Sequence, residues 1–253
     1  TVRHEYGHLC GNHGKTSVWI YRQRRTFVAL YDQIQSSSSD NWMHAVMLKL
    51  LHGFMPYYNA HTFVLSRQNE YEADMTATEL AGAKANASGL IRDTLLGLWI
   101  SETFWPRLYR QADSSMKPAF MPYSAMRTAF KASYPEWATQ ERLNMAWSEK
   151  SGLHDTHPAL RDRVEAIGEA SALPACVETT AAEALLGASA KSLIEEFDHK
   201  WWAREKNEWT ARHQYVTRSR VRLQELSGRP LDELKLHDLQ ELALLTAEFD
   251  SAQ

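Results

Sequence analysis

The chain has 253 residues, of which 44% are hydrophobic and 23% charged, the ordinary composition of a folded globular protein. With 28 Lys and Arg against 31 Asp and Glu, the net charge is -3, so no positive excess points to nucleic acid as a partner. The two cysteines cannot build the disulfide framework of a small secreted domain. These values argue against disordered and collagen-like chains and leave one or two packed domains.

Apolar residues recur at helical spacing along nearly the whole chain, and runs of alternating β-branched residues are scarce. The pattern therefore predicts a mainly α fold. Pro56 is expected to break a long apolar stretch over residues 42–65, because proline removes a backbone donor and clashes inside a helix. The expected helices cover residues 1–13, 17–35, 82–102, 103–112, 123–133, 136–149 and 159–170, and the region 181–253 is helix-rich.

The stretch 42–65 holds only Lys49 as a formal charge and approaches the length of a membrane span. Histidines, an asparagine and Pro56 interrupt it. A buried helix pair is the favoured interpretation, and contact with a membrane is the alternative.

A short Pro-containing link before residue 177 predicts a boundary near residue 175. Residues 1–175 are then the core, and residues 176–253 a C-terminal helical extension that could begin a helical repeat array and dock another protein. Its residues Trp201, Trp202 and Trp209 favour packing between helices over contact with a membrane. We expect the natural protein to extend further towards the N-terminus, because the motif at His4 begins almost at once.

His4, Glu5 and His8 form an H-E-x-x-H motif. In a helix the two imidazoles stand one turn apart on one face, where they can bind one metal ion. Two imidazole nitrogens with a carboxylate suit zinc, which in a catalytic site also keeps a position open for water. The alternative is a solvated helix face with a chance match. Cys10 and His13 lie off the face of His4 and His8 and are left out of the site.

A catalytic zinc ion needs a third protein ligand, and Glu70 is the outstanding candidate. It begins a stripe of residues at helical spacing whose small members permit close approach of another helix: Glu70, Ala73, Asp74, Ala77 and Ala81. Asp74, one turn after Glu70, can accept the remaining N–H of a metal-bound histidine. The alternative is an exposed acidic helix.

Three ordered motifs, H-E-Y-G-H, S-R-x-x-E-Y-E-A-D and T-H-P-x-x-x-x-R, resemble those of the M48 family of zinc metallopeptidases, over about residues 1–170. That family includes membrane-bound HtpX-like heat-shock proteases and CAAX prenyl endopeptidases. The resemblance implies a helical zincin-type core, polypeptide substrates and one zinc ion per chain. It implies His4, His8 and Glu70 as ligands, Glu5 as base, Asp74 as support and His157 near the substrate carbonyl. It also implies a membrane-associated protein with its site facing the cytoplasm, with a cytoplasmic protein as the alternative.

His157 also has a chemical reason to take part in peptide hydrolysis, because negative charge develops on an oxygen and a positioned donor stabilises it. Arg163 could orient a carboxylate or the substrate backbone.

The sequence therefore predicts a zinc-dependent endopeptidase in which Glu5 is the general base. The alternative is a non-catalytic helical interaction protein with a structural metal site. A fourth protein ligand, from His44, His61 or Cys10, would favour that alternative, because catalysis needs water at that position.

Overall fold

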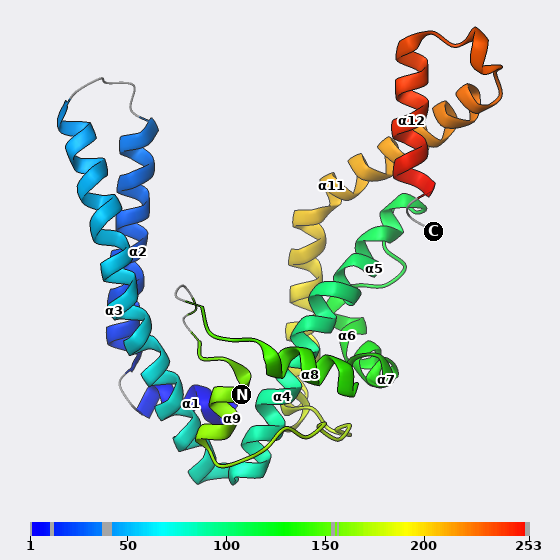
Figure 1. The fold of residues 1–253 in the computed structure, drawn as a ribbon. Coiled ribbons are helices and arrows are strands. Elements are labelled where there is room, and N and C mark those ends of the chain that lie inside the picture. Colours follow the sequence, from blue (N-terminus) through cyan, green and yellow to red (C-terminus); the bar gives the residue numbers. More distant parts are fainter. Residues whose placement is uncertain (1, 11–12, 37–41, 153–154, 156, 251–253) are drawn as a thin grey trace. The chain divides into compact units, whose positions relative to one another are not determined.

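The computed structural model describes residues 2–10, 13–36, 42–152, 155 and 157–250 (Figure 1). All regular secondary structure in these ranges is helical, which confirms the predicted mainly α fold. The chain forms two compact units, residues 1–97 with 134–177 and residues 98–133 with 178–253. The chain passes from the first unit to the second after residue 177, close to the predicted boundary at residue 175. The prediction did not include the earlier segment 98–133, which also belongs to the second unit.

The first unit contains the following helices: α1 (Val2–Cys10), α2 (His13–Ser36), α3 (Trp42–Ala81), most of α4 (Ala83–Trp99), α7 (Tyr134–Trp137), α8 (Gln140–Ser148) and α9 (Leu160–Ala166). The second unit contains a π-helix η1 (Ile100–Phe104), α5 (Trp105–Arg110), η2 (Gln111–Asp113), α6 (Pro122–Ala132), α10 (Ala181–Leu186), α11 (Ser189–Ser227), η3 (Leu231–Glu233) and α12 (Leu236–Asp250).

Helix α3 continues through Pro56, so the predicted break at this residue is wrong. A proline inside a helix costs about 3 kcal/mol. Aromatic contacts with α2 bridge the position: the ring of Phe27 lies 5.5 Å from that of Phe54 and 5.4 Å from that of Tyr58, one on each side of the proline. Packing between α2 and α3 offsets the free-energy cost of the proline. The sequence pattern of a single helix does not reveal such packing.

Helix α1 packs against the C-terminal half of α3, where Ala73 and Ala77 are buried. The two backbones come very close at Gly7. A Cβ atom on Gly7 would lie 2.7 Å from the Cα and 2.9 Å from the carbonyl oxygen of Ala73. The prediction that small residues on this stripe permit close helix approach is confirmed.

The turn between α3 and α4 depends on Gly82, whose φ of +85° is strained for any residue with a side chain. Its N–H donates to the carbonyl oxygen of Thr78 over 2.8 Å. The side chain of Asn86, one turn into α4, donates to the carbonyl oxygen of Asp74 over 3.0 Å and to Thr78 Oγ1 over 3.1 Å. These bonds fix α4 on the end of α3.

Helix α9 packs against α3 and α8. Val164 in α9 and Leu143 in α8 are completely buried, and Leu160 nearly so. The apolar face of α9 therefore packs against the rest of the first unit, and this packing fixes the direction of the polar side chains on the opposite face of α9.

The second unit has an aromatic core around α11. Leu108, Ala112, Trp201 and Trp209 are buried together, and Trp202 packs against them. This confirms that the tryptophans of α11 serve helix packing.

Asp198 of α11 caps the N-terminus of α6. Its carboxylate accepts bonds from the backbone N–H of Tyr123 (2.8 Å) and of Ser124 (3.1 Å), and from the Ser124 hydroxyl. The cap satisfies donors that have no partner inside α6, which starts at Pro122.

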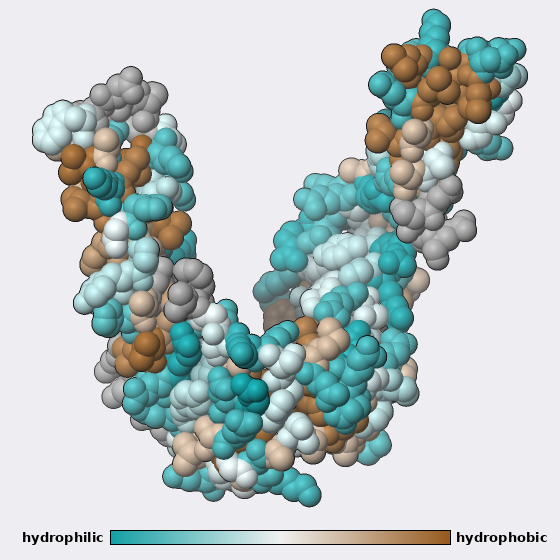
Figure 2. Space-filling model, viewed as in Figure 1, coloured by the Kyte–Doolittle hydropathy of each residue, from teal (hydrophilic) through white to brown (hydrophobic). Residues whose placement is uncertain are grey.

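None of the helices, over the residues that the structure describes, is long and apolar enough to cross a membrane. Figure 2 shows apolar side chains on the surface of the hairpin of α2 and α3. The large exposed ones on the first part of α3 are Trp42, Met43, Val46, Met47, Leu50, Phe54, Tyr57, Val64 and Leu65.

Gly7→Ala is expected to lower the free energy of unfolding by about 1–3 kcal/mol, because the added methyl group meets the backbone of Ala73 and not a flexible side chain. Urea unfolding followed by circular dichroism measures this change. Gly53→Ala in α3 is the matched control: its Cβ meets nothing within 4 Å, and it should stabilise the helix by about 0.5–1 kcal/mol. Equal stability of Gly7→Ala and the parent would contradict the close approach.

Candidate metal centre

His4 and His8 lie on one face of α1, as the spacing of the motif predicts. Their ring centroids are 4.6 Å apart, and His4 Nε2 lies 3.1 Å from His8 Nε2. His4 is buried, and His8 is partly exposed. The two nitrogens face the same point beside α3.

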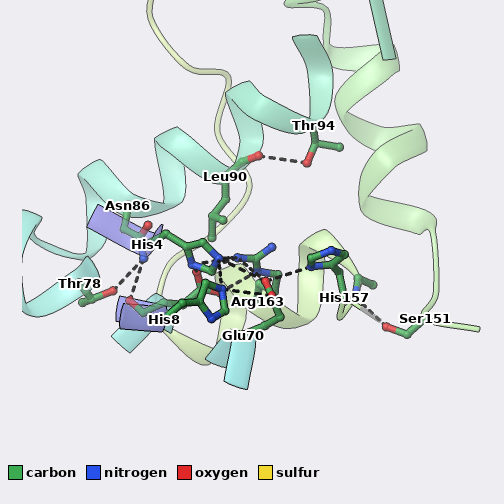
Figure 3. A network of polar contacts seen from close by, with 12 residues as sticks. His4, His8, Glu70, Thr78, Asn86, Leu90, Thr94, Ser151, His157 and Arg163 are labelled. Atoms are coloured by element: carbon green, nitrogen blue, oxygen red, sulfur yellow. Dashed lines mark hydrogen bonds and ion pairs between the residues drawn. The ribbon is translucent and has the colours of Figure 1, made fainter. Parts of the chain in front are cut away.

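Glu70 of α3 reaches the same point (Figure 3). Its Oε2 lies 3.3 Å from His4 Nε2, and its Oε1 lies 3.3 Å from His8 Nε2. One donor atom from each of the three residues lies within 4.8 Å of the other two. The structure therefore brings together the three predicted metal ligands from two helices.

Asp74 holds His4 in a defined orientation. The Oδ1 atom of Asp74 lies 2.9 Å from His4 Nδ1, and both side chains are buried. An ionised carboxylate only accepts, so His4 donates from Nδ1, and in the neutral imidazole the lone pair then lies on Nε2, where a metal ion can bind. This tautomer is the one a metal ligand requires.

Arg163 of α9 clamps Asp74 with two hydrogen bonds. Its Nε donates to Asp74 Oδ2 over 2.7 Å, and its Nη2 donates to Asp74 Oδ1 over 2.8 Å. Such a bidentate pair fixes direction as well as charge. The geometry supports the first of the two predicted roles of Arg163, the orientation of a carboxylate.

The charges of this cluster favour a cation. Burial disfavours a charged His4, but the hydrogen bond to Asp74 and the contact with Glu70 outweigh burial and raise the pKa of His4 to about 9. Burial likewise disfavours a charged Glu70, yet contacts with His157 and His4 hold the pKa of Glu70 well below its usual value. Without a metal ion, a proton on His4 supplies positive charge that the carboxylates attract.

The surroundings of Glu70 Oε2 also favour a cation. This atom is buried and forms no hydrogen bond with any of the described residues. Nitrogens of His157, His4 and Arg163 lie 3.1, 3.3 and 3.4 Å away as ion-pair contacts. A buried acceptor without a hydrogen bond is costly, and a cation between Glu70 and the histidines would satisfy it.

The separations of the donor atoms fit zinc. Bonds of about 2.0–2.2 Å in a tetrahedral arrangement place neighbouring donor atoms about 3.3 Å apart. The two histidine nitrogens lie 3.1 Å apart, and each lies 3.3 Å from one of the two oxygens of Glu70, which is close to this spacing. Over the described part of the chain no fourth His, Cys, Asp or Glu joins the group.

A cavity of about 620 Å³ opens beside the cluster and is lined by His4, Glu70, Glu5 and His157. Glu5 is exposed. The His157 side chain is 67% exposed, and its Nδ1 lies 3.1 Å from Glu70 Oε2, a contact that raises the pKa of His157 against the effect of burial. All seven predicted site residues thus lie at or directly beside one cavity: His4, Glu5, His8, Glu70, Asp74, His157 and Arg163.

The sequence interpretation overlooked two residues that position the site. Gly7 lies between the two histidines and lets α1 approach Ala73. An isolated glycine in a helical pattern was an available signal for such a contact. Asn86 bonds the carbonyl oxygen of Asp74, and nothing in its local sequence marks it. The side chains of Cys10 and His13, excluded from the predicted site, lie outside the part that the structure describes.

The model of peptidase family M48 matches residues 2–171. The match covers nearly all of the first unit and the whole of the segment 98–133. No curated protein and no solved structure matches the chain.

Asp74→Ala is expected to weaken zinc affinity by about 10-fold to 100-fold, because His4 loses the acceptor that fixes its tautomer. Competition with a chromophoric chelator measures the affinity. Asp74→Asn separates charge from shape, and Glu79→Gln, an exposed residue of the same helix, is the control for loss of one negative charge. Unchanged affinity in Asp74→Ala would remove Asp74 from the support of the metal.

Proposed function

The chain belongs to peptidase family M48 and is thus a peptidase that acts on polypeptides, and we propose that it works as a zinc-dependent endopeptidase. The observation that carries this proposal is the convergence of His4, His8 and Glu70 beside an open cavity. Two imidazole nitrogens 3.1 Å apart, each 3.3 Å from an oxygen of Glu70, suit one zinc ion, and the cavity gives a polypeptide access to it.

His4, His8 and Glu70 would hold the zinc ion. When bound, zinc supplies a Lewis acid that polarises the scissile carbonyl and lowers the pKa of a water molecule. The three protein ligands leave a fourth position free for water or substrate.

Glu5 acts as the general base in this proposal. It follows His4 directly, lines the cavity and is not one of the three metal-binding donors. Its carboxylate takes the proton of the attacking water molecule and passes it to the leaving amine.

His157 donates a hydrogen bond to the oxygen on which negative charge develops. Its side chain lines the same cavity, and its exposure leaves room for a substrate beside it. A donor in such a position lowers the barrier of acyl transfer.

Asp74 and Arg163 act on the site as positioning residues. Arg163 fixes both oxygens of Asp74, and Asp74 fixes the ring of His4. This series of contacts orients His4, the proposed metal ligand on the short helix α1.

A structural metal site in a non-catalytic scaffold is the competing function. Such a site is closed by four protein ligands, whereas the group of His4, His8 and Glu70 has three and borders a cavity. This observation favours catalysis.

We also propose that the protein associates with a membrane surface through the exposed apolar side chains of α3, among them Trp42, Leu50 and Tyr57. The protein should float with lipid vesicles in a density gradient. Leu50→Asp should lower partitioning by about 10-fold, since its apolar contact is lost. Leu244→Asp, on the exposed face of α12, is the control. Absence of the parent protein from the vesicle fraction would refute the association.

Glu5→Gln should keep the zinc ion and lose activity by about 100-fold to 10,000-fold, because the base is removed and the ligands remain. Cleavage of an unfolded protein, together with zinc content by atomic emission, tests both parts. His4→Ala is the matched variant that should lose zinc and activity together. An active Glu5→Gln would refute the base assignment, and a zinc-loaded parent that cleaves nothing would favour the scaffold.

A further inference from the structure

Helix α4 forms one wall of the cavity. Its residues Leu90, Asp93 and Thr94 line this wall, and Asp93 contributes a carboxylate. No residue within the described ranges forms a hydrogen bond or an ion pair with Asp93. The preceding residue, Arg92, donates instead to the carbonyl oxygen of Ala175 over 2.9 Å. Asp93 therefore presents a carboxylate without a direct ion-pair partner among the described residues, and Arg92, Arg163 and His4 act on it only as nearby charges.

The positive side chains around the cavity make their direct contacts with other groups than Asp93. Arg163 uses Nε and Nη2 for Asp74. Glu149 and Lys150 are adjacent, both exposed, and opposite in sign. The carboxylate on α4 thus remains available to a positively charged group that enters the cavity.

Helix α4 holds this carboxylate at a fixed place relative to the metal centre. Asn86, Leu90 and Asp93 are spaced to lie on one face of the helix. Asn86 bonds the carbonyl oxygen of Asp74, which anchors that face to the centre. Asp93 follows Asn86 by seven residues, about 10 Å along the helix axis, and lines the same cavity as His4 and Glu70.

We infer that Asp93 selects substrates that carry a lysine or arginine within about three residues of the bond to be cleaved. The inference rests on the proposed peptidase function. A basic side chain pairs with the carboxylate, whereas an acidic side chain is repelled.

The test uses peptides that are identical except for lysine, glutamine or glutamate at one position, with each of three positions on either side of the cleaved bond varied in turn. The zinc-loaded parent should cleave the best lysine peptide about 10-fold more efficiently, in kcat/KM, than its glutamine counterpart. Asp93→Asn should reduce this ratio to about one, and Asp93→Lys should favour glutamate. Glu79→Gln, exposed and outside the cavity, should keep the parent ratio.

Binding of the same peptides to the Glu5→Gln protein, measured by fluorescence anisotropy, gives a readout that does not need turnover. The lysine peptide should bind about 10-fold more tightly than the glutamine peptide, and Asp93→Asn in the same background should abolish the difference. Cleavage without lysine preference, or a preference that survives Asp93→Asn, would overturn the inference and leave the peptidase function intact. Charge-dependent binding with no cleavage by the parent would overturn the peptidase function and support the role of Asp93.

Discussion

The contact of Gly7 with Ala73 is the constraint on which the metal centre depends. The absence of a side chain at Gly7 allows α1 to lie against α3 at a distance that a methyl group would prevent. This approach places His4 within hydrogen-bond distance of Asp74 and within 3.3 Å of Glu70. A helix pair with larger residues at this crossing would hold the same polar groups too far apart to share one ion.

The electrostatics of the cluster follow from this packing. Glu70 and Asp74 are buried carboxylates, and burial of two like charges is costly unless each has a partner. Arg163 compensates chiefly Asp74, through its two hydrogen bonds. Glu70 faces the imidazole nitrogens, so the remaining negative charge is concentrated where a divalent ion would sit. The same arrangement that costs stability without an ion creates affinity for one.

Sequence periodicity predicted the helical class, and it predicted which residues share a face within a helix. The pairs His4 with His8 and Glu70 with Asp74 are local, because helical geometry alone sets their spacing. The continuity of α3 through Pro56 was predicted wrongly, because it depends on contacts with a second helix. The bond from Asn86 to the backbone of Asp74 depends on the turn at Gly82 and has no sequence pattern. Tertiary contacts of this kind lie outside the reach of any single-helix pattern.

The long separation in sequence between the ligands and Arg163 has a consequence for synthesis of the protein. The three donors all lie within the first 70 residues, whereas the guanidinium that compensates Asp74 comes 89 residues after that carboxylate. As the chain emerges from the ribosome N-terminus first, α1 and α3 are translated well before α9. In that interval Arg163 is not yet present, so the counter-charge for both carboxylates has to come from a protonated His4 or from a cation bound at the donors.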